Sequence, residues 1–456
     1  MTTYNTYYFL GIGGIGMSAL ARYYKAKGFP VAGYDRTRTQ LTQEMESEGI
    51  SIFYEDEIAL IPAEYRNPTN CLVVLTPAIP PDSKQWTWFR ENGFTIMKRA
   101  QVLGEITRHA RALCVAGTHG KTTTSTLTAY LLYSSHIGCN AFLGGVSKNF
   151  DKNILINNNT DLVVIEADEF DRSFHQLSPY MAVITAADPD HLDIYGSAEV
   201  FRESFEHFTS LIQKGGCLMM RKDAPVTPRL QEGVKLYTYS GNDGGDFHAE
   251  NIRIGGGEII FDFVTPSKTV KDMQLGVPVL INVENSVAAM AIAYLNCVTE
   301  EELRKGLASF RGIRRRFDFH VKNDRIAYLD DYAHHPKELR ASISSVKALF
   351  PDKKICGIFQ PHLYTRTRDF FRQFAEELSK LDEVILLDIY PARERPIEGI
   401  SSKIIFDEIT TQKTLCTKEE LLAELPKHQF DVLVTMGAGD IEQLIPAITN
   451  YVQNNL

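Results

Sequence analysis

Residues 112–133 of the 456-residue chain read ALCVAGTHGKTTTSTLTAYLLY. An apolar run of strand length, 112–116, leads into a glycine-rich turn, and a stretch of helix length follows at about 122–133. A strand, a glycine-rich turn and a helix in this order bring backbone amides and a helix N-terminus to one place, where phosphate oxygens can bind. The stretch therefore predicts a strand–turn–helix unit of an α/β fold and a nucleotide site within it.

The turn is similar to a P-loop but shorter. The first glycine of GxxxxGK[ST] would fall at Val115, whereas the chain has Gly117. Lys121 can neutralise β- and γ-phosphates, and the Thr122 hydroxyl is a typical ligand of Mg²⁺. We expect the triphosphate loop to consist of Gly117, Thr118, His119, Gly120, Lys121, Thr122 and Thr123.

A second glycine-rich turn, GIGGIG, occupies residues 11–16 between an apolar run at 7–10 and a predicted helix at 17–27. Asp35 ends the next predicted strand. GxGxxG in this context is typical of dinucleotide sites, where it lets backbone amides approach a pyrophosphate. Nicotinamide cofactors and UDP-sugars both carry that group, so the motif predicts phosphate binding without cofactor identity. A purely structural turn is the alternative.

Strand-length apolar runs alternate with helix-length segments along most of the chain, which predicts an α/β protein. Among these elements we expect a strand at 162–166, a helix at 300–309 and a helix at 368–380. We expect three domains: a Rossmann-like domain at 1–108, a central P-loop-type domain with a mixed sheet at 109–312, and a second Rossmann-like domain at 313–456. Within the central domain, residues 237–280 contain repeated glycines and period-two segments. This part predicts a small antiparallel sheet appended to the parallel one.

The composition excludes several classes of function. A net charge of −9 and a pI near 5.8 argue against a broad surface for nucleic acid or anionic membranes. Seven dispersed cysteines without a CxxC pair predict free thiols of a cytosolic protein. No stretch approaches 18 uninterrupted apolar residues. We expect a cytoplasmic protein with small-molecule partners and neither nucleic-acid nor membrane partners.

Acidic groups follow two predicted strands of the central domain, EADEFD at 166–171 and DPDHLD at 188–193. They are candidates for a metal site, because parallel sheets bind ligands at the carboxyl ends of their strands. Mg²⁺ prefers oxygen ligands, so chemistry leaves His191 open between a metal ligand and a loop residue. DDYAHHP at 330–336 and QPHLYTRTR at 360–368 predict an anion-handling cleft in the third domain, with turns at 392–395 and 437–440 at its rim.

The motifs GIGGIGM, GTHGKTTT, EADE, DPDHLD, RRF, DDYAHHP, QPHLYTRT, YPA and GAGD, in this order, resemble those of the Mur ligases over essentially the whole chain. GIGGIGM and DDYAHHP are typical of members that add L-alanine to UDP-N-acetylmuramate and of the murein peptide ligases. The resemblance implies a ligase of peptidoglycan precursor synthesis. ATP would phosphorylate the muramate carboxylate, and the L-alanine amine would attack the acyl phosphate. It also implies Mg²⁺, with Mn²⁺ as an alternative, and a monomer or weak homodimer.

The resemblance also implies roles for single residues. Lys121, Glu166, His191, His334 and Arg366 would be catalytic, and Thr122, Glu166 and His191 would hold the metal. The UDP-substrate would contact Gly11, Gly13, Gly14, Gly16, Asp35, Thr76, Pro77 and Ala78. ATP would also contact Asn282, Asn285, Arg316 and Asp331. Tyr332, His334, His362 and Arg366 would face the amino acid and the reacting carboxylate.

Several positions depart from the family pattern, among them TPAI at 76–79 in place of SSAI and TAA at 185–187 in place of TNI. Two further departures each remove a polar or charged side chain. Ile281 stands where a histidine is common, and Leu363 stands where an arginine is common, which removes a cation from the predicted cleft. Three other functions are open: a recycling ligase that attaches the murein tripeptide, a nicotinamide-dependent oxidoreductase, and a non-catalytic sensor of a nucleotide or UDP-sugar. An oxidoreductase function would not explain the lysine-bearing loop at 117–123.

Overall fold

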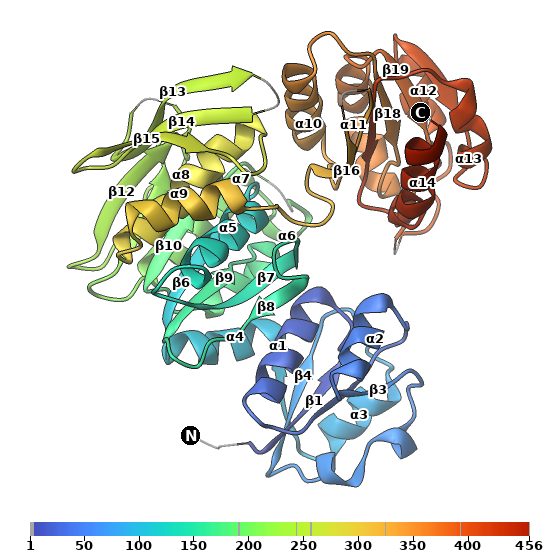
Figure 1. Cartoon of the computed structure of the whole chain (residues 1–456). Helices are drawn as coiled ribbons and strands as arrows, with labels where there is room; N and C mark the ends of the chain where they lie inside the picture. The colour runs from blue at the N-terminus through green and yellow to red at the C-terminus, as the bar shows by residue number, and fades with distance from the viewer. Residues whose placement is uncertain are drawn as a thin grey trace. The chain divides into compact units, whose positions relative to one another are not determined.

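The computed structural model describes residues 4–189, 192–242, 244–255, 258–323, 325–392 and 394–455. Its strands form three sheets, and helices alternate with the strands along the chain (Figure 1), which confirms the predicted α/β class. The chain divides into two compact units. The first comprises Met1–Asn251, Phe261–Met273 and Glu284–Phe310, and the second comprises Ile252–Ile260, Gln274–Val283 and Arg311–Leu456. In the described part of the chain, no helix has the length and apolar character needed to cross a bilayer.

The first sheet has five strands in the order β3-β2-β1-β4-β5, and all neighbours are parallel. The order reverses between β1 and β4, so the turn after β1 lies at the switch point where open α/β sheets bind ligands. The strands are β1 (Thr6–Leu10), β2 (Val31–Tyr34), β3 (Ser51–Phe53), β4 (Cys71–Leu75) and β5 (Thr95–Lys98). The helices are α1 (Ile15–Ala26), α2 (Gln40–Ser47), α3 (Lys84–Glu91) and α4 (Arg99–Arg108).

The second sheet has ten strands in the order β15-β14-β13-β12-β11-β10-β6-β9-β7-β8. Its strands are β6 (Arg111–Ala116), β7 (Asn140–Ser147), β8 (Lys152–Leu155), β9 (Leu162–Glu166), β10 (Met181–Ile184), β11 (Cys217–Arg221), β12 (Lys235–Ser240), β13 (Phe247–Gly255), β14 (Glu258–Val264) and β15 (Thr269–Gln274). Its helices are α5 (Lys121–Tyr133), α6 (Leu192–Tyr195), α7 (Ala198–Ser210), α8 (Leu280–Leu295) and α9 (Glu300–Ser309). The strands within 237–280 extend this sheet, because β12 pairs with β13 in parallel.

The third sheet has six strands in the order β16-β17-β21-β18-β19-β20, and only the described pair β16–β17 is antiparallel. Its strands are β16 (Asp318–Lys322), β17 (Ala327–Asp331), β18 (Ile355–Phe359), β19 (Glu383–Leu386), β20 (Gln412–Leu415) and β21 (Val432–Met436). The helices are α10 (Pro336–Leu349), α11 (Tyr364–Leu378), α12 (Lys403–Glu408), α13 (Leu421–Glu424) and α14 (Ile445–Asn455).

Helix α11 begins earlier than the apolar pattern indicates, at Tyr364 instead of Arg368. The carboxylate of Glu394 accepts hydrogen bonds from the Thr365 amide at 3.0 Å and from the Thr365 hydroxyl at 2.5 Å. An acceptor at the first turn satisfies an amide that the helix itself leaves without a partner. Residues 364–367 of the QPHLYTRT motif are therefore helical.

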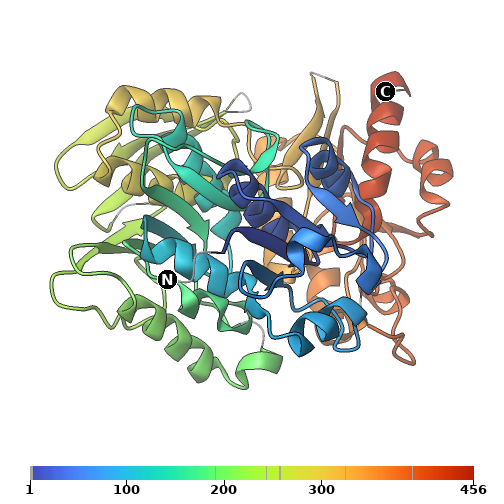
Figure 2. The ribbon, with the colours of Figure 1, turned by 90° about the horizontal axis from the view of Figure 1, so that it is seen from below.

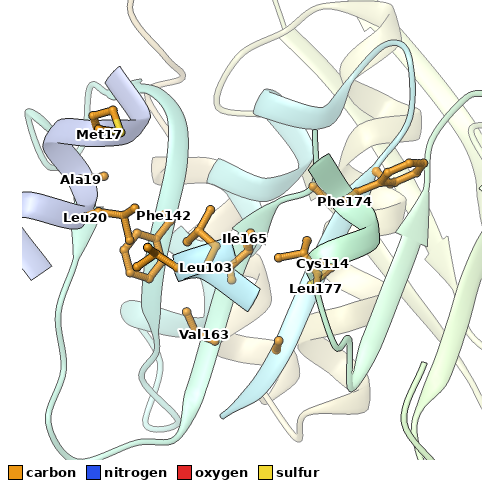
Figure 3. Close-up of a cluster of buried hydrophobic side chains, with 14 of the residues drawn as sticks. Met17, Ala19, Leu20, Leu103, Cys114, Phe142, Val163, Ile165, Phe174 and Leu177 are labelled. Atoms are coloured by element: carbon orange, nitrogen blue, oxygen red, sulfur yellow. The ribbon is translucent and has the colours of Figure 1, made fainter. Parts of the chain in front are cut away.

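Buried side chains within the first unit pack α1 and α4 against the second sheet. Met17 and Leu20 of α1 meet Leu103 of α4, Phe142 of β7 and Ile165 of β9 in one apolar cluster (Figure 3). Helix α1 also runs beside β7 and β8, as the view turned by 90° shows (Figure 2). Each such side chain contributes about 1.5–3 kcal/mol on burial. The packing holds the start of α1 close to the carboxyl end of β9.

Candidate active site

The loop after β6 is shaped by two glycines in the left-handed region. Gly117 has φ +139°, and a Cβ there would lie 2.1 Å from Thr185 Oγ1. Gly120 has φ +78°, and its Cβ would lie 2.6 Å from Asn285 Oδ1. Thr185, which follows β10, donates its hydroxyl to the carbonyl of His119 at 2.5 Å. The neighbouring strand therefore braces the loop, and neither glycine has room for a side chain.

Lys121 is held inside this loop by the carboxylate of Glu169, an acidic residue to which the motifs assigned no role of its own. Its Nζ donates to Gly117 O at 2.6 Å and to both carboxylate oxygens of Glu169 at 2.7 Å. Burial disfavours the ammonium form, but the charges of Glu169 and Glu166 outweigh it and raise the pKa of Lys121. An ammonium has three donors, so a phosphate oxygen that binds Lys121 must replace one of these acceptors.

The two described members of the predicted metal set lie together. Thr122 Oγ1 donates to Glu166 Oε1 at 3.1 Å, and Ser125 Oγ lies 3.4 Å from Glu166 Oε2. A hydroxyl and a carboxylate are hard oxygen ligands, so the pair fits Mg²⁺. The described residues hold no group of three His, Cys, Asp or Glu side chains arranged for a metal ion. His191, the third predicted ligand, lies outside the described residues.

The four carboxylates of segment 166–171 face four different partners. Glu166 meets Thr122, Asp168 lies 3.6 Å from Arg99, Glu169 binds Lys121, and Asp171 lies 3.8 Å from Lys98. Arg99 and Lys98 belong to the start of α4 and the residue before it. The segment therefore lies between the nucleotide loop and helix α4 of the first sheet.

The turn after β1 is braced in the same way as the nucleotide loop. Gly11 has φ +84°, and a Cβ there would lie 2.2 Å from Thr76 Cγ2. The Gly13 amide donates to Asp35 Oδ2 at 2.7 Å. Asp35 thus stabilises the turn by accepting a hydrogen bond from its backbone. Gly14 directly precedes α1, and Gly16 lies in the first turn of that helix. Beyond Thr76 at the end of β4, Pro77 and Ala78 are exposed.

A cavity of about 340 Å³ in the first unit extends from this turn to Glu166 of the predicted metal pair. Its polar and backbone lining includes Gly14, Gly16, Thr76, Arg99, Glu166 and Asp168. The motifs and the family resemblance predicted Gly14, Gly16, Thr76 and Glu166 as site residues but not Arg99. No local signal links Arg99 to the glycine motif, because the two are far apart in the sequence and meet only through the fold.

A second cavity, of about 420 Å³, lies in the second unit. It brings together the four residues predicted for the amino acid with four others, and the lining is Tyr332, His334, His362, Leu363, Arg366, Tyr390, Ala392 and Ala438. Arg366 Nη1 lies 3.2 Å from His362 Nδ1. Burial lowers the pKa of His334, which favours its neutral form at pH 7. The cavity therefore combines the cationic guanidinium of Arg366 with a neutral imidazole, that of His334, able to accept a proton.

Two apolar residues of this cavity have left-handed backbones. Leu363 has φ +71° and Ala392 has φ +50°. The Leu363 amide donates to Tyr390 O at 2.9 Å, which fixes that conformation. Such backbones are uncommon for residues with a side chain and cluster at functional sites. Leu363, for which the family resemblance leads us to expect an arginine, thus contributes an apolar wall, and Ala392 of the predicted rim turn lines the cavity as well.

The remaining predicted contacts to ATP divide between the two units. Asn285 Oδ1 accepts from Thr124 Oγ1 at 3.3 Å beside Gly120, in the first unit. Asn282 donates to Val277 O at 3.2 Å in the second unit. There Arg316 lies 5.1 Å from the Tyr332 ring, and burial raises the pKa of Asp331 to about 6. The roles of these four residues stay predictions.

Comparisons with known proteins agree along the whole chain. Residues 6–111 match the Mur ligase family catalytic domain, residues 115–293 the Mur ligase middle domain, and residues 315–439 the Mur ligase glutamate ligase domain. A UDP-N-acetylmuramate–L-alanine ligase of Parabacteroides distasonis is 61% identical over 97% of this chain and 96% of its own length. One of Phocaeicola vulgatus is 59% identical over 98% of both chains.

Solved structures give the same result. UDP-N-acetylmuramate-alanine ligase of Thermotoga maritima matches with a TM-score of 0.81 at 28% identity and covers 99% of this chain and 100% of its own. A murein peptide ligase of Psychrobacter arcticus shares the fold, with a TM-score of 0.69 at 22% identity over 99% of each chain. With three α/β sheets, a lysine-bearing loop after β6 and these relatives, the chain belongs to the Mur ligase family.

Proposed function

We propose that the protein joins L-alanine to the carboxylate of UDP-N-acetylmuramate at the expense of ATP. The products are UDP-N-acetylmuramoyl-L-alanine, ADP and phosphate. The observation that carries the proposal is the position of Glu166. It pairs with Thr122 of the nucleotide loop and also lines the 340 Å³ cavity that begins at the glycine turn after β1. A UDP-substrate in that cavity would have its carboxylate close to the ATP phosphates.

The first chemical step transfers a phosphoryl group between two anions, which requires positioning and charge neutralisation more than covalent help. Lys121 and the loop amides at 117–123 bind and orient the ATP phosphates. Thr122 and Glu166 would hold Mg²⁺, and we assign His191 as a further ligand. The ion, or Mn²⁺ in its place, supplies charge neutralisation at the transferred group.

The second step forms the amide. His334, neutral because it is buried, accepts a proton from the alanine ammonium group, while Arg366 and His362 bind carboxylate oxygens. The amine nitrogen then attacks the acyl carbon, and phosphate leaves with the electrons of the broken C–O bond. The departing phosphate takes the second proton from the nitrogen, which leaves a neutral amide. We assign Asn282, Asn285, Arg316 and Asp331 to ATP. We assign residues 1–108 to the UDP-substrate, 109–312 to ATP and 313–456 to the amino acid.

The cysteines support a cytoplasmic location. All seven are free, and six of them are buried. Burial raises the pKa of Cys71 to about 11 and that of Cys217 to about 12, which keeps both as unreactive thiols. Free buried thiols are typical of reducing compartments. We also propose a monomer or weak homodimer, which light scattering across a concentration series would test.

Phosphate release by the purified protein tests the reaction. The mixture contains ATP, Mg²⁺ and UDP-N-acetylmuramate, and L-alanine is added or withheld. We expect release that depends on L-alanine, with the amide product detected by mass spectrometry. Release only with the murein tripeptide would identify the recycling ligase. If neither amine causes phosphate release but ATP and the UDP-substrate still bind, the protein would be a non-catalytic sensor.

A further inference from the structure

On the basis of the proposed function, we infer that Arg99 is the cationic contact for the diphosphate of the UDP-substrate. Arg99 begins helix α4 directly after β5 of the first sheet. It lines the 340 Å³ cavity together with Gly14, Gly16 and Thr76, which the sequence motifs place near this substrate. The preceding basic residue, Lys98, is 61% exposed and lies 3.8 Å from Asp171.

The guanidinium of Arg99 lies over the third glycine of the motif. A Cβ at Gly16 would lie 2.5 Å from Arg99 Nη1, so the arginine occupies the space that the absent side chain leaves. Gly16 lies in the first turn of α1, ahead of the first intrahelical bond from the Ser18 amide to Gly14 O at 2.8 Å. The amides of this turn point out of the helix N-terminus and favour an anion. Arg99 thus adds a full charge where the backbone already favours phosphate.

The present partner of Arg99 is weakly bound. Arg99 Nη2 and Asp168 Oδ2 are 3.6 Å apart, which is longer than a hydrogen bond. The two side chains are 29% and 40% exposed, and ion pairs of this kind contribute little to stability. Asp168 Oδ1 also accepts from the Phe170 amide at 3.1 Å. A diphosphate can therefore replace Asp168 and form the two-pronged contact that guanidinium groups make with phosphate oxygens.

The substrate carries a second anionic group, the muramate carboxylate. The diphosphate and this carboxylate are expected at different ends of the cavity. Arg99 lies over Gly16 in the turn after β1, which is where a dinucleotide-type motif meets pyrophosphate. The reacting carboxylate has to reach the phosphoryl donor at the nucleotide loop, on the side of Glu166 and Thr122. The geometry therefore assigns Arg99 to the diphosphate.

Calorimetric titration without ATP or L-alanine tests the assignment. UDP-N-acetylmuramate, UDP and UMP are titrated into the wild-type protein, R99Q, R99K and D168N. We expect R99Q to weaken binding of UDP-N-acetylmuramate and UDP equally, by about 10- to 100-fold, and that of UMP by less. R99K retains the positive charge but loses the two-pronged geometry of the guanidinium. Its affinity for UDP and UDP-N-acetylmuramate should therefore lie between those of the wild type and R99Q. D168N removes the competing carboxylate and should strengthen UDP binding a few-fold.

Arg108→Gln is the matched control. Arg108 lies at the other end of α4, is 46% exposed and pairs with Glu105, so its loss should leave all three affinities unchanged. Unchanged ATP binding by R99Q would show that the unit is folded. Equal UDP affinity of R99Q and wild type would overturn the inference. If R99Q lost affinity for UDP-N-acetylmuramate but not for UDP, Arg99 would contact the muramate carboxylate instead, and the diphosphate assignment would be overturned. A wild-type protein that binds none of the three would overturn the proposed function as well.

Discussion

The chain contains two glycine-rich turns of the same construction, at 11–16 and at 117–120, and they obtain their positive charge in different ways. Each turn links a central parallel strand to a helix, and each is braced by a side chain that follows the neighbouring strand. Asp35 after β2 accepts from the Gly13 amide, and Thr185 after β10 donates to the His119 carbonyl. The nucleotide loop has its own Lys121, whereas the first turn has no basic residue and faces Arg99 of α4.

The difference shows what a local motif can reveal. Lys121 is visible in the sequence because its charge lies within the loop that it serves. Arg99 reaches the first turn only because α4 and α1 both pack on the second sheet (Figure 3). The two turns should therefore respond separately to mutation, and each experiment below tests that separation.

The largest effect is expected for Lys121→Ala. Removing the only charge that the loop itself carries should lower kcat by about 10³-fold or more, because the developing phosphate charge loses its main protein cation. Binding of UDP-N-acetylmuramate, measured without ATP, should stay within about twofold of wild type. Lys98→Ala, at an exposed lysine, is the control. A comparable loss of UDP-substrate affinity in Lys121→Ala would mean that the two turns act as one site.

Alanine substitutions at one glycine of each turn should affect the free energy of unfolding to different extents. Gly117→Ala forces a Cβ to within 2.1 Å of Thr185 Oγ1 at a left-handed backbone, so we expect a loss of about 2–4 kcal/mol in unfolding free energy and of ATP binding. At Gly14, φ is −64° and the nearest atom to a new Cβ is 3.6 Å away. Gly14→Ala should therefore unfold like wild type. Urea denaturation of both variants measures this, and equal stability would contradict the steric argument.

Glu169→Gln tests how tightly the nucleotide loop holds its own lysine. Lys121 would keep a polar neighbour but lose its charged partner, so unfolding free energy should fall by about 1–3 kcal/mol. A non-hydrolysable ATP analogue should then raise Tm more than it does in wild type, because the phosphates restore the missing negative charge. Glu105→Gln, on the exposed face of α4, is the control. Identical Tm shifts in variant and wild type would show that ATP does not displace Glu169.

The smallest effects are expected at the two braces. Asp35→Asn and Thr185→Val should each cost about 1 kcal/mol of stability, the usual contribution of a hydrogen bond. Asp35→Asn should weaken UDP binding a few-fold and leave ATP binding unchanged, and Thr185→Val should do the reverse. Titration of both ligands into both variants and the double variant checks this. Non-additive losses in the double variant would reveal coupling between the turns.

Much of the fold could be predicted because its signals are local. The apolar runs located β9 at 162–166 and α9 at 300–309 without error, and the glycines marked both turns. The start of α11 was missed, since the cap that defines it comes from Glu394, thirty residues further along. The same reason separates two kinds of site residue. Lys121 and Glu166 were assigned roles from their motifs. Glu169 lies in the EADE motif, but its pairing with Lys121, like the approach of Arg99 to the first turn, depends on packing.

The cavity of the second unit also depends partly on contacts that local sequence patterns do not predict. Its histidines and Arg366 were predicted from motifs, and Leu363 and the turn at 392–395 were expected at the cleft and its rim. The backbone conformation with which Leu363 and Ala392 line the cavity was not predicted. Their contribution depends on left-handed backbones and on the pairing of residue 362 with residue 390. A pattern of residue types does not encode such a conformation, because leucine and alanine ordinarily avoid it.

These two backbones also bear on how the protein would respond to directed evolution. Glycine fits a left-handed conformation better than leucine or alanine does, so a library screened only for heat resistance should enrich glycine at 363 and 392. The same changes would remove the apolar wall from the cavity. A screen for growth that depends on the ligation product should instead retain Leu363 and Ala392. The two selections would therefore drive the same pair of codons in opposite directions.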